Sequence, residues 1–237
     1  MEFYPSILEW PEMLMRDKRL TWALSGQSAS GGRTLAGAVP RVRLDGGGLW
    51  MATLSDLQVS TPDQVRVYRA LEARLDGGAT PVVLSRRDVL FYPAPLDAFG
   101  SRVTSYSDAP HDDGGYFDDG TGFYTPTVSA TAAAAALRAT TLTVTITVGS
   151  ALKGGEVFSI EHDTFSHRMY TVAKVDGSDI TIRPPLREAI VAGTRLEFDY
   201  PKCVMQLAGT SEMDLPLELR TYGQTTVKFI ESFPPWP

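Results

Sequence analysis

The stretch Thr141-Leu-Thr-Val-Thr-Ile-Thr-Val148 decides the fold that this chain is expected to adopt. Its aliphatic residues alternate with threonine, and a period of two is typical of a strand that buries one face. Four more β-rich runs follow at 156–160, 168–175, 180–183 and 195–200, separated by turns rich in glycine, proline and aspartate. Because no helix long enough for a parallel crossover lies between them, the sequence predicts a small antiparallel barrel or sandwich.

The segments on either side of this block contain a second group of predicted strands. A glycine hairpin at 45–48 is predicted to join strands 39–44 and 49–54. The other predicted strands are 20–24, 81–84 with a further hydrophobic run at 88–93, 203–207, 215–220 and 225–230. We expect the strands before residue 100 and after residue 203 to share one sheet.

This arrangement predicts two domains. Residues 1–128 plus 203–237 form the first, and residues 129–202 form a module inserted into it. The predicted fold class is mainly β with one clear helix.

The clear helix is predicted at 62–75. Thr61 is placed at its N-cap, Pro62 at the first helical position and Gln64 at the third, which is a capping box with a proline start. An apolar stripe at helical spacing follows, made of Val65, Tyr68, Leu71 and Leu75. The alanine-rich segment 128–137 is predicted to be either a short helix or an extended linker.

Composition and charge limit the class of protein. The chain has 237 residues, a hydrophobic fraction of 43% and a charged fraction of 21%, which are ordinary for a globular protein. It has no apolar run of membrane-spanning length, and its start lacks the pattern of a signal peptide. Its net charge is −6 and it contains no basic tract. We therefore expect neither a membrane nor nucleic acid as its main partner.

Two residues are candidates for nucleophilic chemistry. Ser28 lies in Gly26-Gln-Ser-Ala-Ser30, which resembles a nucleophile elbow but ends in serine instead of glycine and lies in a predicted loop at 25–38. Cys203 is the only cysteine, so it excludes an intrachain disulfide, and its strand-like surroundings predict a buried, inert thiol. We expect no catalytic residue, no cofactor and no enzymatic activity.

Two groups of residues invite a metal-site hypothesis. The predicted loop 97–128 is rich in aspartate and glycine and contains His111, so a calcium site is one alternative and a solvated or interface loop the favoured one. His162 and His167 flank a turn, where zinc would need a third ligand that the sequence does not supply. A hairpin tip is the favoured interpretation there, and the sequence predicts no metal.

Both termini are rich in aromatic residues. We expect such segments to cover the chain's own core or to contact a neighbouring subunit. The residues predicted to form an oligomer interface are Phe3, Tyr4, Trp10, Phe233 and Trp236.

Several segments together resemble the distal tail proteins of long-tailed (siphovirus-type) phages and related tail-like particles. They are Arg69-Ala-Leu-Glu-Ala-Arg-Leu75, Asp112-Asp-Gly-Gly-Tyr-Phe-Asp-Asp-Gly-Thr-Gly122, Leu137-Arg-Ala-Thr-Thr-Leu142, Gly154-Gly-Glu-Val-Phe-Ser-Ile160, Ile182-Arg-Pro-Pro-Leu-Arg-Glu188 and Val227-Lys-Phe-Ile-Glu231. The resemblance runs through most of the chain and rests on the general character of these segments and on their order in the sequence. It carries no catalytic motif.

The resemblance implies a structural role in the virion. In that family a β-rich belt forms a hexameric ring that joins the tail tube to the baseplate hub, and an appended domain points outward. By this analogy, residues 1–128 and 203–237 would be the belt and 129–202 the outward module. The implied partners are further copies of the chain, the tail-tube protein and hub or fibre proteins, and DNA would pass through the ring. By the same analogy, we expect the chain to lack the larger galectin-like C-terminal domain that many members of that family carry.

Two other functions remain open on the sequence. The inserted module would be a docking module of the tail tip, for a host surface or a receptor-binding protein. Alternatively, paired carboxylates in the acidic loop, such as Asp112 and Asp119, would serve a cell-wall hydrolase.

Overall fold

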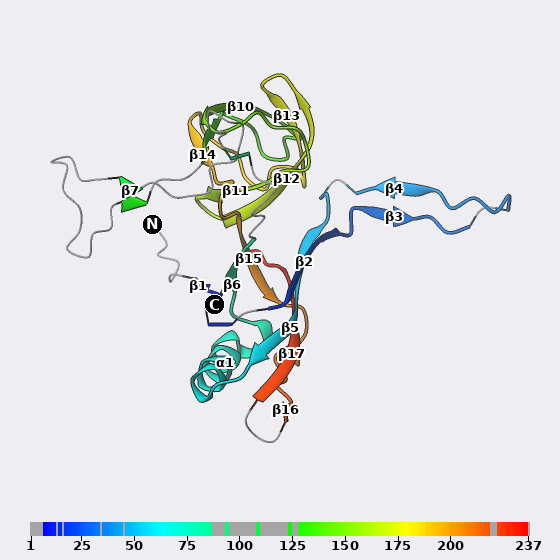
Figure 1. Cartoon of the computed structure of the whole chain (residues 1–237). Helices are drawn as coiled ribbons and strands as arrows, with labels where there is room; N and C mark the ends of the chain where they lie inside the picture. Colours follow the sequence, from blue (N-terminus) through cyan, green and yellow to red (C-terminus); the bar gives the residue numbers. More distant parts are fainter. Residues whose placement is uncertain are drawn as a thin grey trace. The chain divides into compact units, whose positions relative to one another are not determined.

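Figure 1 shows the chain as a computed structural model. The structure describes residues 7–12, 14–15, 17–33, 35–44, 46–86, 93–94, 108–109, 123–124, 128–218 and 222–236. Strands make up 47% of it and helical residues 9%, with one α-helix, which confirms the predicted mainly β class.

The chain divides into two compact units. Unit 1 consists of Met1–Ser85, Asp163–Arg168 and Lys202–Pro237, and unit 2 of Arg86–His162 and Met169–Pro201. Unit 1 is therefore assembled from segments that precede, interrupt and follow unit 2 in the sequence. The assignment of 1–128 plus 203–237 as a ring-forming domain and of 129–202 as an inserted module stays a prediction.

A seven-stranded sheet forms the framework of unit 1. Its order is β1-β6-β15-β17-β5-β2, with β16 paired to β17, and all its pairs are antiparallel except β1 with β6. The bounds are β1 Leu8–Glu9, β2 Arg19–Ser25, β5 Leu49–Val59, β6 Val82–Ser85, β15 Lys202–Leu207, β16 Leu217–Glu218 and β17 Tyr222–Glu231. The late strands β15 and β17 lie side by side between the early pairs β1-β6 and β5-β2, so the expected common sheet is present.

The long strand β5 shows how the sheet selects its buried face. Trp50, Ala52 and Leu54 are buried in alternation, and the buried phase then shifts by one residue to Leu57. The shift occurs at Asp56, which has a φ of 57° and lies where the β5–β17 register is irregular. A β-bulge of this kind adds one residue to one strand and re-aims the side chains beyond it.

Helix α1 spans Pro62–Leu75 and begins as predicted. The Thr61 side chain accepts a hydrogen bond from the Gln64 backbone N–H at 3.2 Å, and the Gln64 side chain accepts one from the Thr61 N–H, also at 3.2 Å. The helix ends at Asp76, which has a left-handed conformation, and a short 3₁₀ turn, η1 (Asp76–Gly78), follows. Among the described residues, no helix has the length and apolar character needed to cross a membrane.

One face of α1 supplies part of the core of unit 1. Tyr68, Leu71 and Leu75 are buried, as the predicted stripe requires. Burial raises the pKa of the Tyr68 hydroxyl above its ordinary value, because the phenolate would lose its hydration. The side chain therefore stays neutral throughout the physiological pH range.

The predicted glycine hairpin at 45–48 is wrong, and the predicted loop at 25–38 is correct only in part, because Ser25 ends β2 and Ser28–Ser30 form β3. β5 pairs with β2, while β4 (Arg41–Arg43) pairs with β3 (Ser28–Ser30), so the chain reverses farther out, between β3 and β4. The glycines after Leu44 instead let the two paired segments pass from the sheet into β3 and β4. Gly48 has a φ of 87°, and a Cβ there would lie 2.3 Å from the Ser25 carbonyl oxygen.

Unit 2 contains a six-stranded sheet that nearly closes into a barrel. Its order is β11-β12-β13-β10-β9-β14. Its ends meet where Ser159 and Glu197 exchange two backbone hydrogen bonds of 2.9 Å. The bounds are β9 Ser129–Ala132, β10 Thr141–Val148, β11 Val157–His162, β12 Ser166–Asp176, β13 Asp179–Arg183 and β14 Thr194–Leu196. Of the predicted alternatives, the structure selects the barrel, although its last strand ends at 196 and not at 200.

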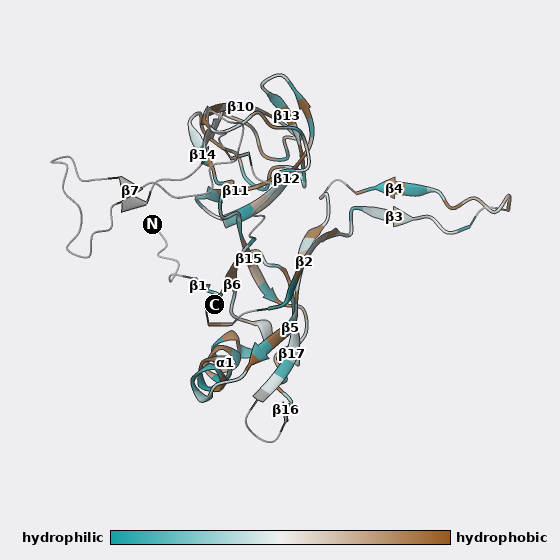
Figure 2. Cartoon of the chain, viewed as in Figure 1, coloured by the Kyte–Doolittle hydropathy of each residue, from teal (hydrophilic) through white to brown (hydrophobic). Residues whose placement is uncertain are grey.

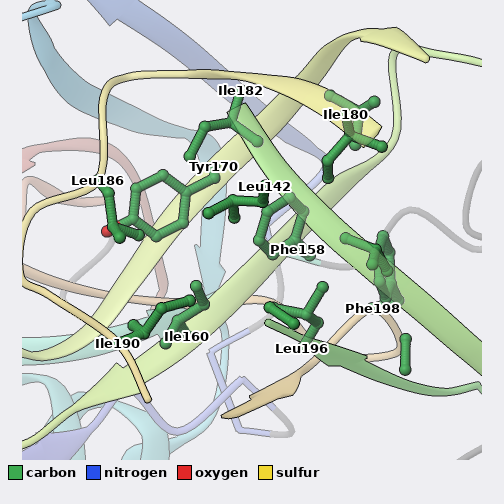
Figure 3. Close-up of a cluster of buried hydrophobic side chains, with 14 of the residues drawn as sticks. Leu142, Phe158, Ile160, Tyr170, Ile180, Ile182, Leu186, Ile190, Leu196 and Phe198 are labelled. Carbon is green, nitrogen blue, oxygen red and sulfur yellow. The ribbon is translucent and has the colours of Figure 1, made fainter. Parts of the chain in front are cut away.

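The barrel is filled by side chains from every strand. Figure 3 shows Phe158 and Leu142 at the centre of this cluster, with Tyr170 and Phe198 close by. The Phe158 ring lies 5.7 Å from the Tyr170 ring and 5.3 Å from the Phe198 ring, measured between centroids. Full burial of such side chains contributes roughly 1.5–3 kcal/mol each, so this core gives unit 2 its main stabilising term.

The alanine-rich segment is a strand and not a helix. Ala130 and Ala132 of β9 are almost completely buried in the barrel. β9 pairs with β10 on one side and with β14 on the other. Tertiary pairing therefore overrides the intrinsic helix preference of alanine, and the small side chains fit where the barrel wall is crowded.

The structure describes few residues of the expected loop 97–128. Within it, β7 (Asp108–Ala109) pairs with β8 (Phe123–Tyr124). The hydrophobic run 88–93 lies outside the described residues except for its last position, and the predicted strand 215–220 is described only up to residue 218, as β16.

Two glycines with nearly equal φ angles, Gly48 and Gly32, provide a test of the close packing at Gly48. Gly48→Ala is expected to lower the free energy of unfolding of unit 1 by about 2 kcal/mol or more, because a clash with Ser25 adds to backbone strain. Gly32 has a φ of 86° and open space around it. For Gly32→Ala we therefore expect the free energy of unfolding to fall by less than about 1 kcal/mol. All four tryptophans of the chain belong to unit 1, so urea unfolding followed by tryptophan fluorescence reports on this unit. Equal losses in both variants would contradict the close packing at Gly48.

Candidate functional site

The two nucleophile candidates occupy different environments. Ser28 is exposed in β3, and its cross-strand partner is Arg43. An arginine cannot act as the general base that a serine nucleophile needs. Cys203 in β15 is fully buried, as predicted, and its Sγ faces the Val204 carbonyl at 3.7 Å.

The two histidines of the predicted hairpin tip lie on different strands, His162 at the end of β11 and His167 near the start of β12. The turn at 163–165 joins β11 to β12, which confirms the hairpin. His162 is buried, and its Nε2 lies 2.8 Å from the Tyr170 hydroxyl, which also accepts a hydrogen bond from the Arg187 N–H at 3.0 Å. His162 therefore anchors a polar contact inside unit 2.

In the described part of the chain, no group of three or more histidine, cysteine, aspartate or glutamate side chains is arranged to hold a metal ion. Most of the acidic loop, including His111, Asp112 and Asp119, lies outside that part. Its calcium and catalytic alternatives stay predictions.

Unit 1 also has a polar cleft of about 860 Å³. Asp56, Glu212 and Asp214 line it together with hydroxyl side chains. The Asp56 carboxylate accepts a hydrogen bond of 2.7 Å from Gln224. Among the described residues, these carboxylates do not form a group that could hold a metal ion.

The predicted interface residues fall into three groups. Phe3 and Tyr4 lie outside the described residues. Trp10 is 5% exposed and packs edge-on against Phe229 of β17, with ring centroids 5.4 Å apart. In the single chain Trp10 therefore belongs to the core of unit 1.

Phe233 belongs to a cluster around a buried ion pair. The Arg168 side chain is fully buried, and its Nη1 lies 3.5 Å from Oε1 of Glu231, which is also fully buried. The other carboxylate oxygen of Glu231 accepts a hydrogen bond from the Trp50 N–H at 3.1 Å. The Arg168 guanidinium lies over the Phe233 ring, 4.2 Å from its centroid, and its Nε donates to the Phe165 carbonyl at 2.9 Å.

The last residues of the chain extend this cluster. Trp236 Nε1 donates to the Ser232 hydroxyl at 3.1 Å, and that hydroxyl donates to the Gln206 side-chain oxygen at 2.9 Å. Phe233 and Trp236 are thus partly buried within their own unit. Their role in an oligomer interface stays a prediction.

Sequence reasoning missed the ion pair, although a signal was present. Val227 and Phe229 of β17 are buried, and Glu231 has the same phase in the alternation. A carboxylate at a buried position of a strand needs a partner of opposite charge. The pattern alone does not identify that partner, because Arg168 lies far away in the sequence.

The most exposed apolar surface of unit 1 lies on β3, β4 and the residues between them, 28–43, which we call the arm. Among the described strands, β3 and β4 pair with each other alone, and their residues are exposed on both faces. Leu35 is fully exposed, Val42 is 65% exposed and Val39 is 51% exposed. Figure 2 shows hydrophobic and hydrophilic residues next to one another along the arm, which Figure 1 shows leading away from β2 and β5.

The arm also has a distinct charge. It contains Arg33, Arg41 and Arg43 but no aspartate or glutamate. Since the net charge of the whole chain is −6, the remainder of the chain carries −9. The arm is therefore a basic, partly apolar element on an acidic protein.

Comparison with known proteins adds no relative to these observations. No protein-family model matches the chain, and no curated protein matches it.

The buried pair can be tested by a double-mutant cycle. Arg168→Met and Glu231→Gln are each expected to lower the free energy of unfolding of unit 1 by about 3–5 kcal/mol, because each leaves its partner's charge buried and uncompensated. The double variant should lose at least about 1 kcal/mol less than the sum of the two. Urea unfolding followed by tryptophan fluorescence measures all three.

The exposed Arg66–Asp63 pair of α1, at 2.9 Å, is the control for this cycle, because it lies in unit 1 like the buried pair. Arg66→Met should change the free energy of unfolding by less than about 0.5 kcal/mol. Additive losses in the cycle would show that Arg168 and Glu231 do not depend on each other.

Proposed function

We propose that this chain is a structural virion protein of a phage tail tip. In this role its copies form a ring, a hexamer in the family that the sequence resembles, which connects the tail tube to the baseplate hub. The chain would be assembled in the host cytoplasm and would act without a cofactor and without catalysis. Its partners would be further copies of itself, the tail-tube protein and hub or fibre proteins.

The observation that carries the proposal is the exposed arm. Leu35, Val39 and Val42 place aliphatic surface in solvent on an element that covers no core. Strand edges and apolar surface of this kind favour association with another protein. In a protein that assembles with other copies, such an element would provide the surface that becomes buried in the contact.

The chain's organisation supports the same proposal. Unit 1 draws its sheet from both ends of the sequence, and the barrel of unit 2 lies between them in chain order. This order fits a belt with an inserted module, as the resemblance implies. Rings are built from head-to-tail interfaces that close by rotation, and these require different surfaces on the two sides of each copy.

The acidic net charge is compatible with a ring around DNA. A lumen without a basic lining would let DNA pass with little retention, since nonspecific binding depends on neutralised phosphates. The charge of −6 concerns the whole chain and does not assign any surface to the lumen.

A groove in unit 2 favours a second candidate function, a docking module for a receptor-binding protein or a host surface. The groove has a volume of about 350 Å³. Its side chains include Val144, Ile146, Leu152 and Ile180. This aliphatic lining suits a segment of protein better than a glycan, because sugars are usually held by polar groups and aromatic rings.

The ring proposal predicts the mass of the assembled chain. Light scattering over a range of concentrations should show the mass of a closed oligomer, six chains if the family's symmetry applies, and negative-stain images should show rings with a central opening. A monomer at every concentration, alone and with tail-tube protein, would contradict the proposal. Binding of a receptor-binding protein by that monomer, lost in Ile146→Asp, would favour the docking module.

A further inference from the structure

We infer that the arm docks on a second copy of this chain, on the acidic remainder outside residues 28–43, which we call the body. Each copy would then place its arm on the body of the next copy. This inference rests on the proposed ring and deepens it, because it names the element that makes the head-to-tail contact. It concerns residues 28–43, none of which was expected from the sequence to form an interface.

The first argument is the arm's unpartnered surface. β3 and β4 form a separate two-stranded sheet, so each strand has one edge that no described strand covers. An isolated two-stranded hairpin is marginally stable in water. Packing against another chain would order the arm and bury Leu35, Val39 and Val42, for which unit 1 provides no core.

The second argument is charge, which selects the occupant. The arm carries three arginines and no acidic residue, and the rest of the chain carries −9. Pairing two arms would bring like charges together, whereas placing an arm on the body of another copy joins opposite charges. Charge thus favours an arm-to-body contact, which is the heterologous type that produces rings.

The third argument separates a protein partner from nucleic acid. Basic residues alone would suit phosphates, and protein–DNA interfaces are more polar and more positive than those between proteins. The arm instead exposes aliphatic side chains as well as arginines, and Val42 lies on the face of β4 opposite to Arg41 and Arg43. An exposed aliphatic face favours a protein partner over nucleic acid.

The test uses the full chain with a photo-crosslinking residue in place of Val42. Chains labelled with nitrogen-14 and nitrogen-15 are mixed, irradiated and digested, so that contacts between copies appear as peptide pairs of mixed label. We expect mixed pairs that join the arm to segments outside residues 28–43. Cross-links confined to one label, or joining arm to arm, overturn the inference.

Reversing the charge of the arm in the chain that carries the photo-crosslinking residue tests how far the contact between copies depends on charge. The yield of mixed-label pairs is measured. Arg33→Glu, Arg41→Glu and Arg43→Glu together should lower the yield of mixed pairs at least about ten-fold. Leu35→Ser with Val39→Ser should also lower it. The control reverses Arg69, Arg74 and Lys153, which are exposed outside the arm and give the same change in net charge. An equal loss in the control would show a general charge effect and overturn the inference.

The outcomes for arm and ring are distinguishable. If the wild-type chain and the arm-reversal variant both form rings, the ring proposal stands, but the arm is not part of the ring interface and the inference is overturned. A wild-type chain that forms neither rings nor mixed pairs overturns both. Binding of a DNA duplex that arm reversal abolishes, with the ring unaffected, would assign the arm to nucleic acid and overturn the inference.

Discussion

A buried ion pair, Arg168 with Glu231, is the constraint on which unit 1 depends. Removing two charges from water is costly, and the 3.5 Å contact between Nη1 of Arg168 and Oε1 of Glu231 needs further partners to recover that cost. Here the carboxylate also holds the backbone of Trp50, and the guanidinium rests on the ring of Phe233. The pair therefore joins residues 163–168, strand β5 and the end of the chain, which are three distant parts of the sequence.

The same chain leaves a second element without a core of its own. The arm continues β2 and β5, so the hydrogen bonds of the large sheet position its base. No described strand pairs with the outer edge of β3 or of β4. Leucine and valine side chains that stay exposed to water on such an extension add no stability to the fold. Their presence makes sense when burial occurs on association, and this links the fold to the proposed assembly.

Much of the fold followed from local patterns. Alternation in Thr141–Val148 identified β10, and the capping box at Thr61 identified the start of α1, because both signals act over a few residues. The glycines at 45–48 misled, since a turn and a bend in a long hairpin use the same residue type. The alanine-rich segment left a short helix and an extended linker open, and pairing of β9 with β10 and β14 selects the extended form over the helix preference of alanine.

The sequence by itself determined the mainly β class, helix α1 and most strands of the barrel. Hydrophobic periodicity and helix capping depend on residues that are neighbours in the chain, so both can be recognised without the tertiary structure. Only the tertiary structure decided which strands pair, that Trp10 and Phe233 pack within their own unit, and that Arg168 meets Glu231. These are contacts between residues far apart in the chain. Local preference does not encode them, since many partners satisfy the same pattern and the shared core selects one.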